Sequence, residues 1–373
     1  MLPGGVFSTK YETDVAILRT KTQWFLLALG IMFLFVIPLF APDYWLSQLT
    51  YLAIVIVAVL GLHVLTGLCG QISIGHAAFM AVGAYAIAIL TTRYEPFGAD
   101  GDWIWAWLCL PISALAAGLV GLIFGLPCFK LKGFYLAIST LAAWYIIIWC
   151  LKYDGFSSVT GGFIGLPLDP LHIGGTIEGG QAKGALIDFS SRGSLYCLAV
   201  AVMIVAAFIA KNIQRTSAGR AFVAIRDNEL AAEVNGINIF RYKMLAFFIG
   251  CLFAGVAGWL WAHSQLRVNP NQFSLLDSIW YVGMLIIGGW GSTSGVFFGA
   301  AFLKLLEIGM TDYITPWLGD MLPSIKLQVH VATDIVRGMV IVLFMMLAPR
   351  GIYYLGERLK IYYRLHPYAY WAR

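Results

Sequence analysis

A charged segment, Thr216–Lys243, holds the residue types best suited to contacts with another protein, and it lies between two long apolar stretches. Asp227 or Asn228 can begin a short helix that Gly236 ends, because Asp and Asn favour helix N-termini and Gly favours the position after a helix. Asn238 can begin the next helix, which continues into the apolar stretch. The pattern predicts a compact knob suited to docking with a partner protein. The alternative is an ordinary basic loop of a membrane protein.

Two glycine-rich interruptions, Gly67–Gly75 and Gly288–Gly295, place polar residues within apolar stretches. Both read as glycine, spacer, serine and glycine, followed by an apolar helix. Matched interruptions indicate an internal repeat with broken helices, which survive at membrane depth only when they are buried or line a cavity. Two interpretations stay open here, close helix packing through small residues and a transport pathway. His76 follows the first interruption at a helix start, where it tends to be neutral and to hydrogen-bond with the backbone.

Motifs for other chemistry are absent from the sequence. There is no GxxxxGK[ST], HExxH or GxSxG, so Walker-type ATP binding, metalloprotease and serine hydrolase functions lack support. The six histidines are dispersed and the six cysteines form no CxxC, so neither a metal site nor a cofactor nor a disulfide framework is expected. Lys304 with Glu307, and Asp334 with Arg337, are spaced to pair along a helix. These pairs are functional candidates or snorkelling anchors.

Composition places these features in a lipid bilayer. Of 373 residues, 60% are hydrophobic and 12% are charged, whereas about a quarter are charged in soluble domains. Runs of about 20 apolar residues predict an all-α polytopic integral membrane protein. The net charge of +5 implies no nucleic acid partner, because basic residues gather in the loops. We predict about ten transmembrane helices: Trp24–Ala41, Trp45–Leu65, Ala77–Thr92, Ile104–Leu126, Phe134–Leu151, Ser194–Ala210, Met244–His263, Leu276–Gly289, Gly295–Met310 and Asp334–Pro349.

The basic residues also predict an orientation. Lys10, Arg19 and Lys21 precede the first span, which places the N-terminus inside. Counting crossings then puts Lys130 and Lys132 inside as well. The resulting division has an inner N-terminal segment (1–23), a transmembrane domain (24–350) with an inner loop (211–243) and a glycine-rich outer segment (152–192), and an inner C-terminal tail (351–373).

Six sequence blocks resemble the permease subunit of branched-chain amino-acid ABC importers, the LivM type. The blocks occur in the order of that family and span most of Gly70–Ile352. One such block is weak support, whereas six in register are specific. They read GQISIGHAAFMAVGAY (Gly70–Tyr85), LKGFYLAISTLA (Leu131–Ala142), SSVTGGFIGL (Ser157–Leu166), AGRAFVAIRDNELAAEVNGIN (Ala218–Asn238), IIGGWGSTSGVFFGA (Ile286–Ala300) and APRGI (Ala348–Ile352).

The resemblance implies a transport subunit, not an enzyme, in the bacterial cytoplasmic membrane. The implied partners are a second permease subunit (LivH-like) in a heterodimer, two cytoplasmic ATPase subunits, a periplasmic or extracellular solute-binding protein and the lipid bilayer. The charged knob resembles the EAA loop of such permeases, whose short helix fits a groove in the ATPase. Alanines at the matching positions permit close approach, and acids can meet basic partner groups; these positions are Glu229, Ala231, Ala232, Glu233 and Gly236. Arg226 is a further candidate for coupling to the ATPase.

The substrate that the resemblance implies is a zwitterion with an apolar side chain. Backbone groups and helix termini of a polar, glycine-rich break can meet its charged ends. Trp280, at a position that is acidic in many relatives, and Trp290, between the glycines, depart from the family pattern and leave the exact substrate open. The candidate residues of the substrate pathway are Gln71, Ser73, His76, Ser292, Thr293 and Ser294.

Three alternatives remain at this stage. A related ABC importer for urea or short amides shares the architecture, although the GQISIGHAAF block looks more like the amino-acid branch. An ion-coupled secondary transporter needs embedded carboxylates, which are sparse here. A membrane enzyme needs a convergent acid, base and nucleophile, and the sequence offers no such set.

Overall fold

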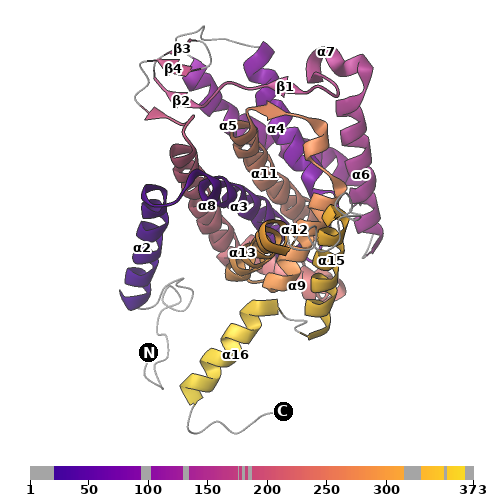
Figure 1. Cartoon of the computed structure of the whole chain (residues 1–373). Helices are drawn as coiled ribbons and strands as arrows, with labels where there is room; N and C mark the ends of the chain where they lie inside the picture. Colours follow the sequence, from indigo (N-terminus) through magenta and orange to yellow (C-terminus); the bar gives the residue numbers. More distant parts are fainter. Residues whose placement is uncertain are drawn as a thin grey trace.

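Helices dominate the computed structural model, which describes residues 21–93, 102–128, 134–174, 176–178, 181–183, 187–314, 329–347 and 351–365 (Figure 1). The long helices are α2 (Lys21–Val36), α3 (Asp43–Leu62), α4 (His76–Arg93), α5 (Asp102–Cys128), α6 (Phe134–Lys152), α8 (Arg192–Arg215), α11 (Ile239–Gln265), α12 (Leu275–Gly288), α13 (Thr293–Gly309), α15 (Val329–Leu347) and α16 (Gly351–Leu365). The shorter ones are α7 (Ser157–Thr160), α9 (Ser217–Asp227) and α10 (Glu229–Val234), with single turns η1 (Ile37–Leu39), η2 (His63–Leu68), η3 (Asp154–Phe156), η4 (Pro270–Gln272) and η5 (Met310–Ile314).

Helix α11 forms the centre of the bundle. It packs against α3, α4 and α5, and α3 also packs against α8. Large side chains on α11, among them Trp259 and Phe247, are completely buried. A helix that is apolar around its whole circumference is stable only inside a protein or a membrane. The sequence of α11 therefore fits its central place.

Within the described residues, eight helical stretches are long and apolar enough to cross a bilayer, and each coincides with a span predicted from the sequence. The predicted all-α membrane fold is therefore confirmed, whereas the count of ten is not. The helix expected at Leu276–Gly289 is α12, whose 14 residues reach about 21 Å at 1.5 Å per residue, short of the roughly 30 Å hydrocarbon core. The span expected at Asp334–Pro349 corresponds to α15, several of whose side chains lie outside the described residues.

The two ends of the bundle differ in structure. Short strands in residues 152–192 lie at one end, in the upper part of Figure 1, and α9 lies at the other. The strands pair antiparallel as β1 (Leu166–Pro167) with β6 (Arg267–Val268), β2 (His172–Ile173) with β5 (Ile187–Asp188), and β3 (Thr176–Glu178) with β4 (Gln181–Lys183). These strands were not expected from the sequence, because each is only two or three residues long.

Several orientation signals fall on residues outside the described part of the chain. They include Lys10, Arg19, Lys130 and Lys132. The proposed division of the chain into an inner N-terminal segment, a transmembrane domain and an inner tail therefore stays a prediction.

Candidate functional site

Three side-chain caps build the docking knob, which we define as α9, α10 and the first turn of α11. Thr216 accepts a hydrogen bond from the backbone N–H of Gly219 at the start of α9 (3.2 Å). Asn228 accepts one from Ala231 at the start of α10 (3.1 Å). Caps of this kind satisfy N–H groups that have no partner within the helix. Asn228 is thus the cap of the predicted helix, while α9 before it was not predicted.

Asn238 caps the next helix, as the sequence predicts. Its Oδ1 accepts from the backbone N–H of Arg241 at 3.0 Å, and α11 then continues without a break to Gln265. The knob is therefore continuous with the central helix of the bundle. A movement of the knob is therefore transmitted to α11 through the continuous helix backbone.

Gly236 ends α10 in the left-handed region, with φ of +81°. Its N–H donates to the Glu233 carbonyl at 2.9 Å, and the following N–H of Ile237 donates to Ala232 at 3.0 Å. A Cβ added at Gly236 would have no heavy atom within 4 Å. The requirement for glycine is thus one of backbone conformation and not of space.

The exposed face of α10 is partly apolar. Leu230 is 67% exposed and Val234 is 89% exposed, beside exposed Ala231 and Glu233. Ala232 is buried, which lets α10 lie close to its neighbours. Large apolar side chains exposed together are typical of a surface that another protein covers.

Glu229 has a partner within the knob and is partly exposed, with 29% of its side chain accessible. Its carboxylate pairs with Lys243 Nζ, and the Lys243 side chain is 7% exposed. A buried ammonium group needs such a counter-charge, because desolvation of an unpaired charge is costly. Glu229 therefore fixes α10 to α11, and Glu233 remains as the exposed acid of the predicted pair.

Arg226, at the end of α9, touches both glycine-rich interruptions. Its Nη1 donates to the carbonyl of Gly67 at 2.9 Å. A Cβ on Gly70, which has φ of +76°, would lie 3.0 Å from Arg226 Cγ, and one on Gly291 would lie 3.0 Å from Arg226 Nη1. Asp227 holds the guanidinium with contacts of 2.9 and 3.0 Å. One arginine thus joins the knob to both breaks.

The two interruptions also contact each other directly. Trp290 Nε1 donates to the carbonyl of Thr66 at 3.0 Å, and Thr293 Oγ1 lies 3.4 Å from Nε2 of the buried His63. Gln214, on α8, reaches the Gly291 carbonyl at 3.4 Å. Trp290, which departs from the family pattern, therefore connects the second interruption to the residue that precedes the first. Nothing in the sequence indicated His63 or Gln214 as part of this cluster.

The first interruption places its polar residues in the interior. Gln71, Ser73 and His76 are 2%, 1% and 0% exposed. His76 Nε2 lies 3.0 Å from the Ala58 carbonyl, so the predicted backbone contact is confirmed. Gln71 Oε1 and Ser73 Oγ have no hydrogen-bond partner in the described part of the chain. Buried polar atoms without a partner are uncommon, and they favour a pathway for a polar ligand over simple packing.

Side chains from two other helices stabilise the backbone around this break. Thr140 Oγ1 accepts from the N–H of Ile74, and Ser278 Oγ accepts from the N–H of Ala77, each at 3.0 Å. These backbone N–H groups at and just before the start of α4 therefore have hydrogen-bond partners inside the bundle. Neither residue was identified from the sequence, because each lies far along the chain from the N–H group that donates to it.

The second interruption is organised differently. Ser292 caps α13 by accepting from the N–H of Gly295 at 3.2 Å. Thr293 is buried and Ser294 is exposed. A Cβ on Gly288 would lie 2.0 Å from the Gly295 carbonyl oxygen, so α12 and α13 pack backbone to backbone. This contact supports the packing interpretation for the second break, with Thr293 facing the first.

The embedded charge pair Lys304–Glu307 forms as its spacing predicts. The two groups are 3.4 Å apart, and Lys304 Nζ also lies 4.1 Å from the centre of the Tyr51 ring. The side chains of Asp334 and Arg337 lie outside the described residues. Among the residues that are described, no cluster of three metal-ligating side chains occurs.

We expect Gln71→Ala to lower transport several-fold without preventing folding. The Oε1 acceptor has no protein partner in the described part of the chain, and the Nε2 donor has only a weak 3.6 Å contact with the Cys69 thiol. The substitution therefore leaves no strongly hydrogen-bonded group unsatisfied. Ser158→Ala is the matched control, because Ser158 is exposed in α7, outside both interruptions. Uptake and recovery of the purified protein are the measurements. Uptake of Gln71→Ala at the level of Ser158→Ala would assign the first break to packing alone.

Comparisons with known proteins agree on one family. The family described as "Branched-chain amino acid transport system / permease component" matches residues 44–345. The high-affinity branched-chain amino acid permease protein LivM of Escherichia coli K12 is 33% identical over 277 residues, 71% of this chain and 63% of that protein. A probable LivM of Methanocaldococcus jannaschii is 23% identical over 283 residues, 68% of this chain and 77% of that protein.

Similarity extends to permeases with other named cargo. The autoinducer 2 import permease LsrC of Enterobacter sp. strain 638 is 32% identical over 137 residues, 35% of this chain and 40% of that protein. The chain spans less than two thirds of the length of the Escherichia coli and Salmonella typhimurium relatives, 63% in each case. No solved structure matches the chain.

Proposed function

Because the chain belongs to the family of branched-chain amino acid transport permease components, we propose that it is the transmembrane permease subunit of a binding-protein-dependent ABC importer. The proposed cargo is a branched-chain or otherwise hydrophobic amino acid. Its relatives are transport components, not enzymes. ATP hydrolysis is therefore assigned to partner subunits.

The observation that carries this proposal is the position of Arg226. It joins the knob, through the 2.9 Å bond to Gly67 and the contacts with Gly70 and Gly291, to both broken helices. A permease driven by a separate ATPase needs a rigid connection between the docking surface and the helices that move. A hydrogen bond from a charged donor to a partly buried carbonyl is among the stronger ones in proteins.

A second connection complements the first. The ion pair between Glu229 and Lys243 fixes α10 to α11, which contacts α3, α4 and α5. In the proposed mechanism, ATP binding closes the ATPase subunits and displaces the knob. Arg226 and Glu229 then carry that displacement to the two breaks and to the central helix, and the packed bundle switches between outward-open and inward-open arrangements.

The proposed assembly follows from this mechanism. It contains a second permease subunit, two cytoplasmic ATPase subunits that cover the exposed face of α10, and a periplasmic or extracellular solute-binding protein at the opposite end. We assign the chain to the bacterial cytoplasmic membrane with both termini inside. The permease domain is taken as residues 24–350, the coupling loop as 211–243 and the outer segment as 152–192.

The proposed substrate pathway passes the first break. Gln71 and Ser73 offer buried polar atoms without protein partners, and His76 lies directly after them. A zwitterion has both donors and acceptors for such groups. Importers that receive cargo from a binding protein can hold it weakly, so a tight site is not required.

Single cysteines at Ser158 and Ser217 test the orientation. Both serines are exposed, at opposite ends of the bundle. In a cysteine-free background, an impermeant thiol reagent added to intact cells should label a cysteine at position 158 and not one at position 217. Labelling both after permeabilisation is the control. The reverse pattern would invert the assigned topology and place the knob where no ATPase can reach it.

Purification of the intact complex from its native membrane tests the proposed assembly. We expect a second permease chain and two ATPase subunits to co-purify with this chain in fixed proportion. Substitution of both Leu230 and Val234 by Ser should release the ATPase subunits and retain the second permease. Recovery of the chain without any ATPase, before substitution, would contradict the proposal.

A further inference from the structure

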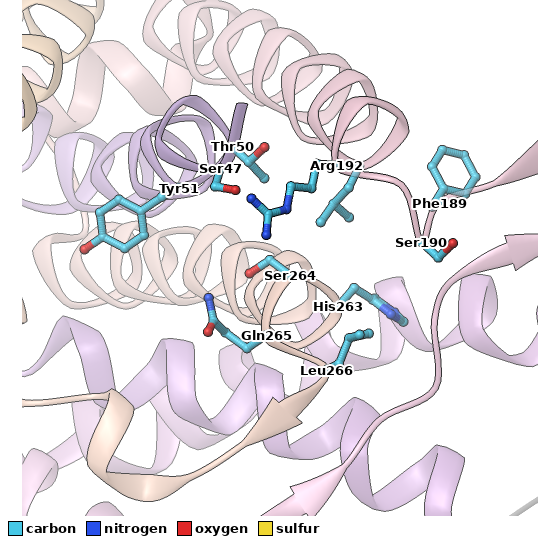
Figure 2. A pocket seen from close by; sticks show the side chains of 11 residues that line it. Ser47, Thr50, Tyr51, Phe189, Ser190, Arg192, His263, Ser264, Gln265 and Leu266 are labelled. Atoms are coloured by element: carbon cyan, nitrogen blue, oxygen red, sulfur yellow. The ribbon is translucent and has the colours of Figure 1, made fainter. Parts of the chain in front are cut away.

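A pocket of about 310 Å³ opens at the end of the bundle opposite the knob. It lies between the first turns of α3, the start of α8 and the last turn of α11 (Figure 2). Volumes of this order are typical of sites for small molecules. The pocket is separate from the two glycine-rich breaks, which lie beside α9.

Two basic side chains line this pocket. Figure 2 shows Arg192 extending from α8 toward Ser47 and Ser264, while the ring of His263 lies between the end of α11 and Ser190. Within the described residues, no carboxylate pairs with the Arg192 guanidinium. A charged group that lines a cavity without a counter-ion provides a site for an anion.

His263 provides an independent observation. It is 4% exposed, and neither of its ring nitrogens has a hydrogen-bond partner in the described part of the chain. The ring packs edge-on against Trp259, with 4.6 Å between the ring centres. Since buried imidazoles are normally hydrogen-bonded, an imidazole lining the pocket without a partner indicates that a ligand supplies one.

The other lining residues define the class of ligand. Hydroxyls of Ser47, Thr50, Ser190 and Ser264 line it together with apolar groups of Leu195, Leu266 and Phe189. Among the residues that the structure describes, no Asp or Glu lines the pocket. The lining therefore suits a small molecule with one anionic end and an apolar end, and it offers no carboxylate to a cation.

We propose that this pocket is a receiving site for the carboxylate of the transported amino acid, with Arg192 holding the carboxylate and His263 completing its hydrogen bonds. This inference rests on the proposed transport function. The pocket would take the amino acid at the outer end of the bundle, before it reaches the polar groups of the first break.

Three related probes test the proposal by saturation-transfer NMR on the ATP-free permease–ATPase complex in nanodiscs, without the solute-binding protein. Leucine carries both charged groups, isovalerate only the carboxylate and leucinamide only the ammonium. We expect signals for leucine and isovalerate and a much weaker one for leucinamide. Arg192→Gln should raise the dissociation constant of leucine at least about tenfold, because a charge-assisted bond is lost.

Arg267→Gln is the matched control, since Arg267 is exposed in the neighbouring strand β6 and does not line the pocket. It should bind leucine like the unmodified protein. His263→Phe, which keeps an aromatic ring against Trp259, should weaken binding of leucine and isovalerate alike. Absence of binding to the unmodified complex, equal binding of leucinamide, or an unchanged constant in Arg192→Gln would each overturn the proposal.

ATP-driven uptake separates this inference from the transport function. Uptake of leucine that is insensitive to Arg192→Gln would refute the receiving site and leave the importer intact. Carboxylate binding that depends on Arg192, together with no ATP-driven uptake, would refute the importer and leave the pocket as an anion site.

Discussion

Arg226→Gln is expected to reduce ATP-driven uptake by a factor of about ten to a hundred while the permease still binds its ATPase. The substitution removes the charged donor to the Gly67 carbonyl and the contacts with Gly70 and Gly291. A hydrogen bond to a charged group contributes about 1.5–3 kcal/mol, which corresponds to that range of factors. The docking face of α10 is unchanged, so the ATPase should bind and hydrolyse ATP without coupled transport.

Arg220→Gln is the matched control, because Arg220 also lies on α9 and its Nη1 donates to the Arg215 carbonyl within the same segment. Uptake and ligand-stimulated ATP hydrolysis should stay near the unmodified level in that variant. If both arginine variants transport normally, the contact of Arg226 with the breaks has no part in coupling. If both lose ATPase binding, Arg226 acts at the docking surface instead.

Gly236→Val is expected to abolish productive docking, whereas Gly236→Asn should retain part of it. At φ of +81°, any side chain costs roughly 1 kcal/mol or more, and a β-branched one costs more than Asn. The absence of atoms within 4 Å of an added Cβ means that the penalty is purely conformational. The end of α10 would then shift, and Leu230 and Val234 would no longer lie where the ATPase binds them.

Pull-down of the ATPase and ligand-stimulated hydrolysis measure this effect, and the order should be unmodified, then Asn, then Val. Membrane insertion should be the same in all three, because Gly236 is exposed at the surface. If both variants bind the ATPase and stimulate hydrolysis like the unmodified protein, the knob is only a connecting loop. That result would support the alternative of an ordinary basic loop of a membrane protein.

Local features of the knob were predictable because they depend on neighbouring residues. Asn228 and Asn238 cap their helices, and Gly236 adopts positive φ, each through contacts within a few positions. Propensity rules describe such short-range contacts well. The role of α9 was missed, because its sequence carries no equally clear start signal beyond Thr216.

The contacts that assemble the site were not predictable from spacing. Arg226 reaches Gly67 across 159 positions, and Trp290 reaches Thr66 across 224. The ion pair of Glu229 with Lys243 was not foreseen either, because it depends on the packing of α10 on α11, which buries that lysine. The pairing of distant segments depends on the tertiary fold, which a single sequence does not specify at this level.

The helix count shows the same limit. Eight spans within the described residues agree with hydropathy, because the thickness of the bilayer requires about 20 apolar residues in each crossing helix. Helix α12 is apolar enough to be predicted as a span, yet it has only 14 residues, and Ser278 on it accepts a hydrogen bond from the start of α4. Hydropathy does not distinguish a short apolar helix from one that is long enough to cross the bilayer.

Uptake of labelled leucine into proteoliposomes tests the central claim most directly. Vesicles with the complete complex and an excess of binding protein should accumulate leucine only when ATP is supplied on the side of the knob. Vesicles with this chain alone, under an imposed proton or sodium gradient, should accumulate none. Robust gradient-driven uptake by the chain alone, without any ATPase, would contradict the account.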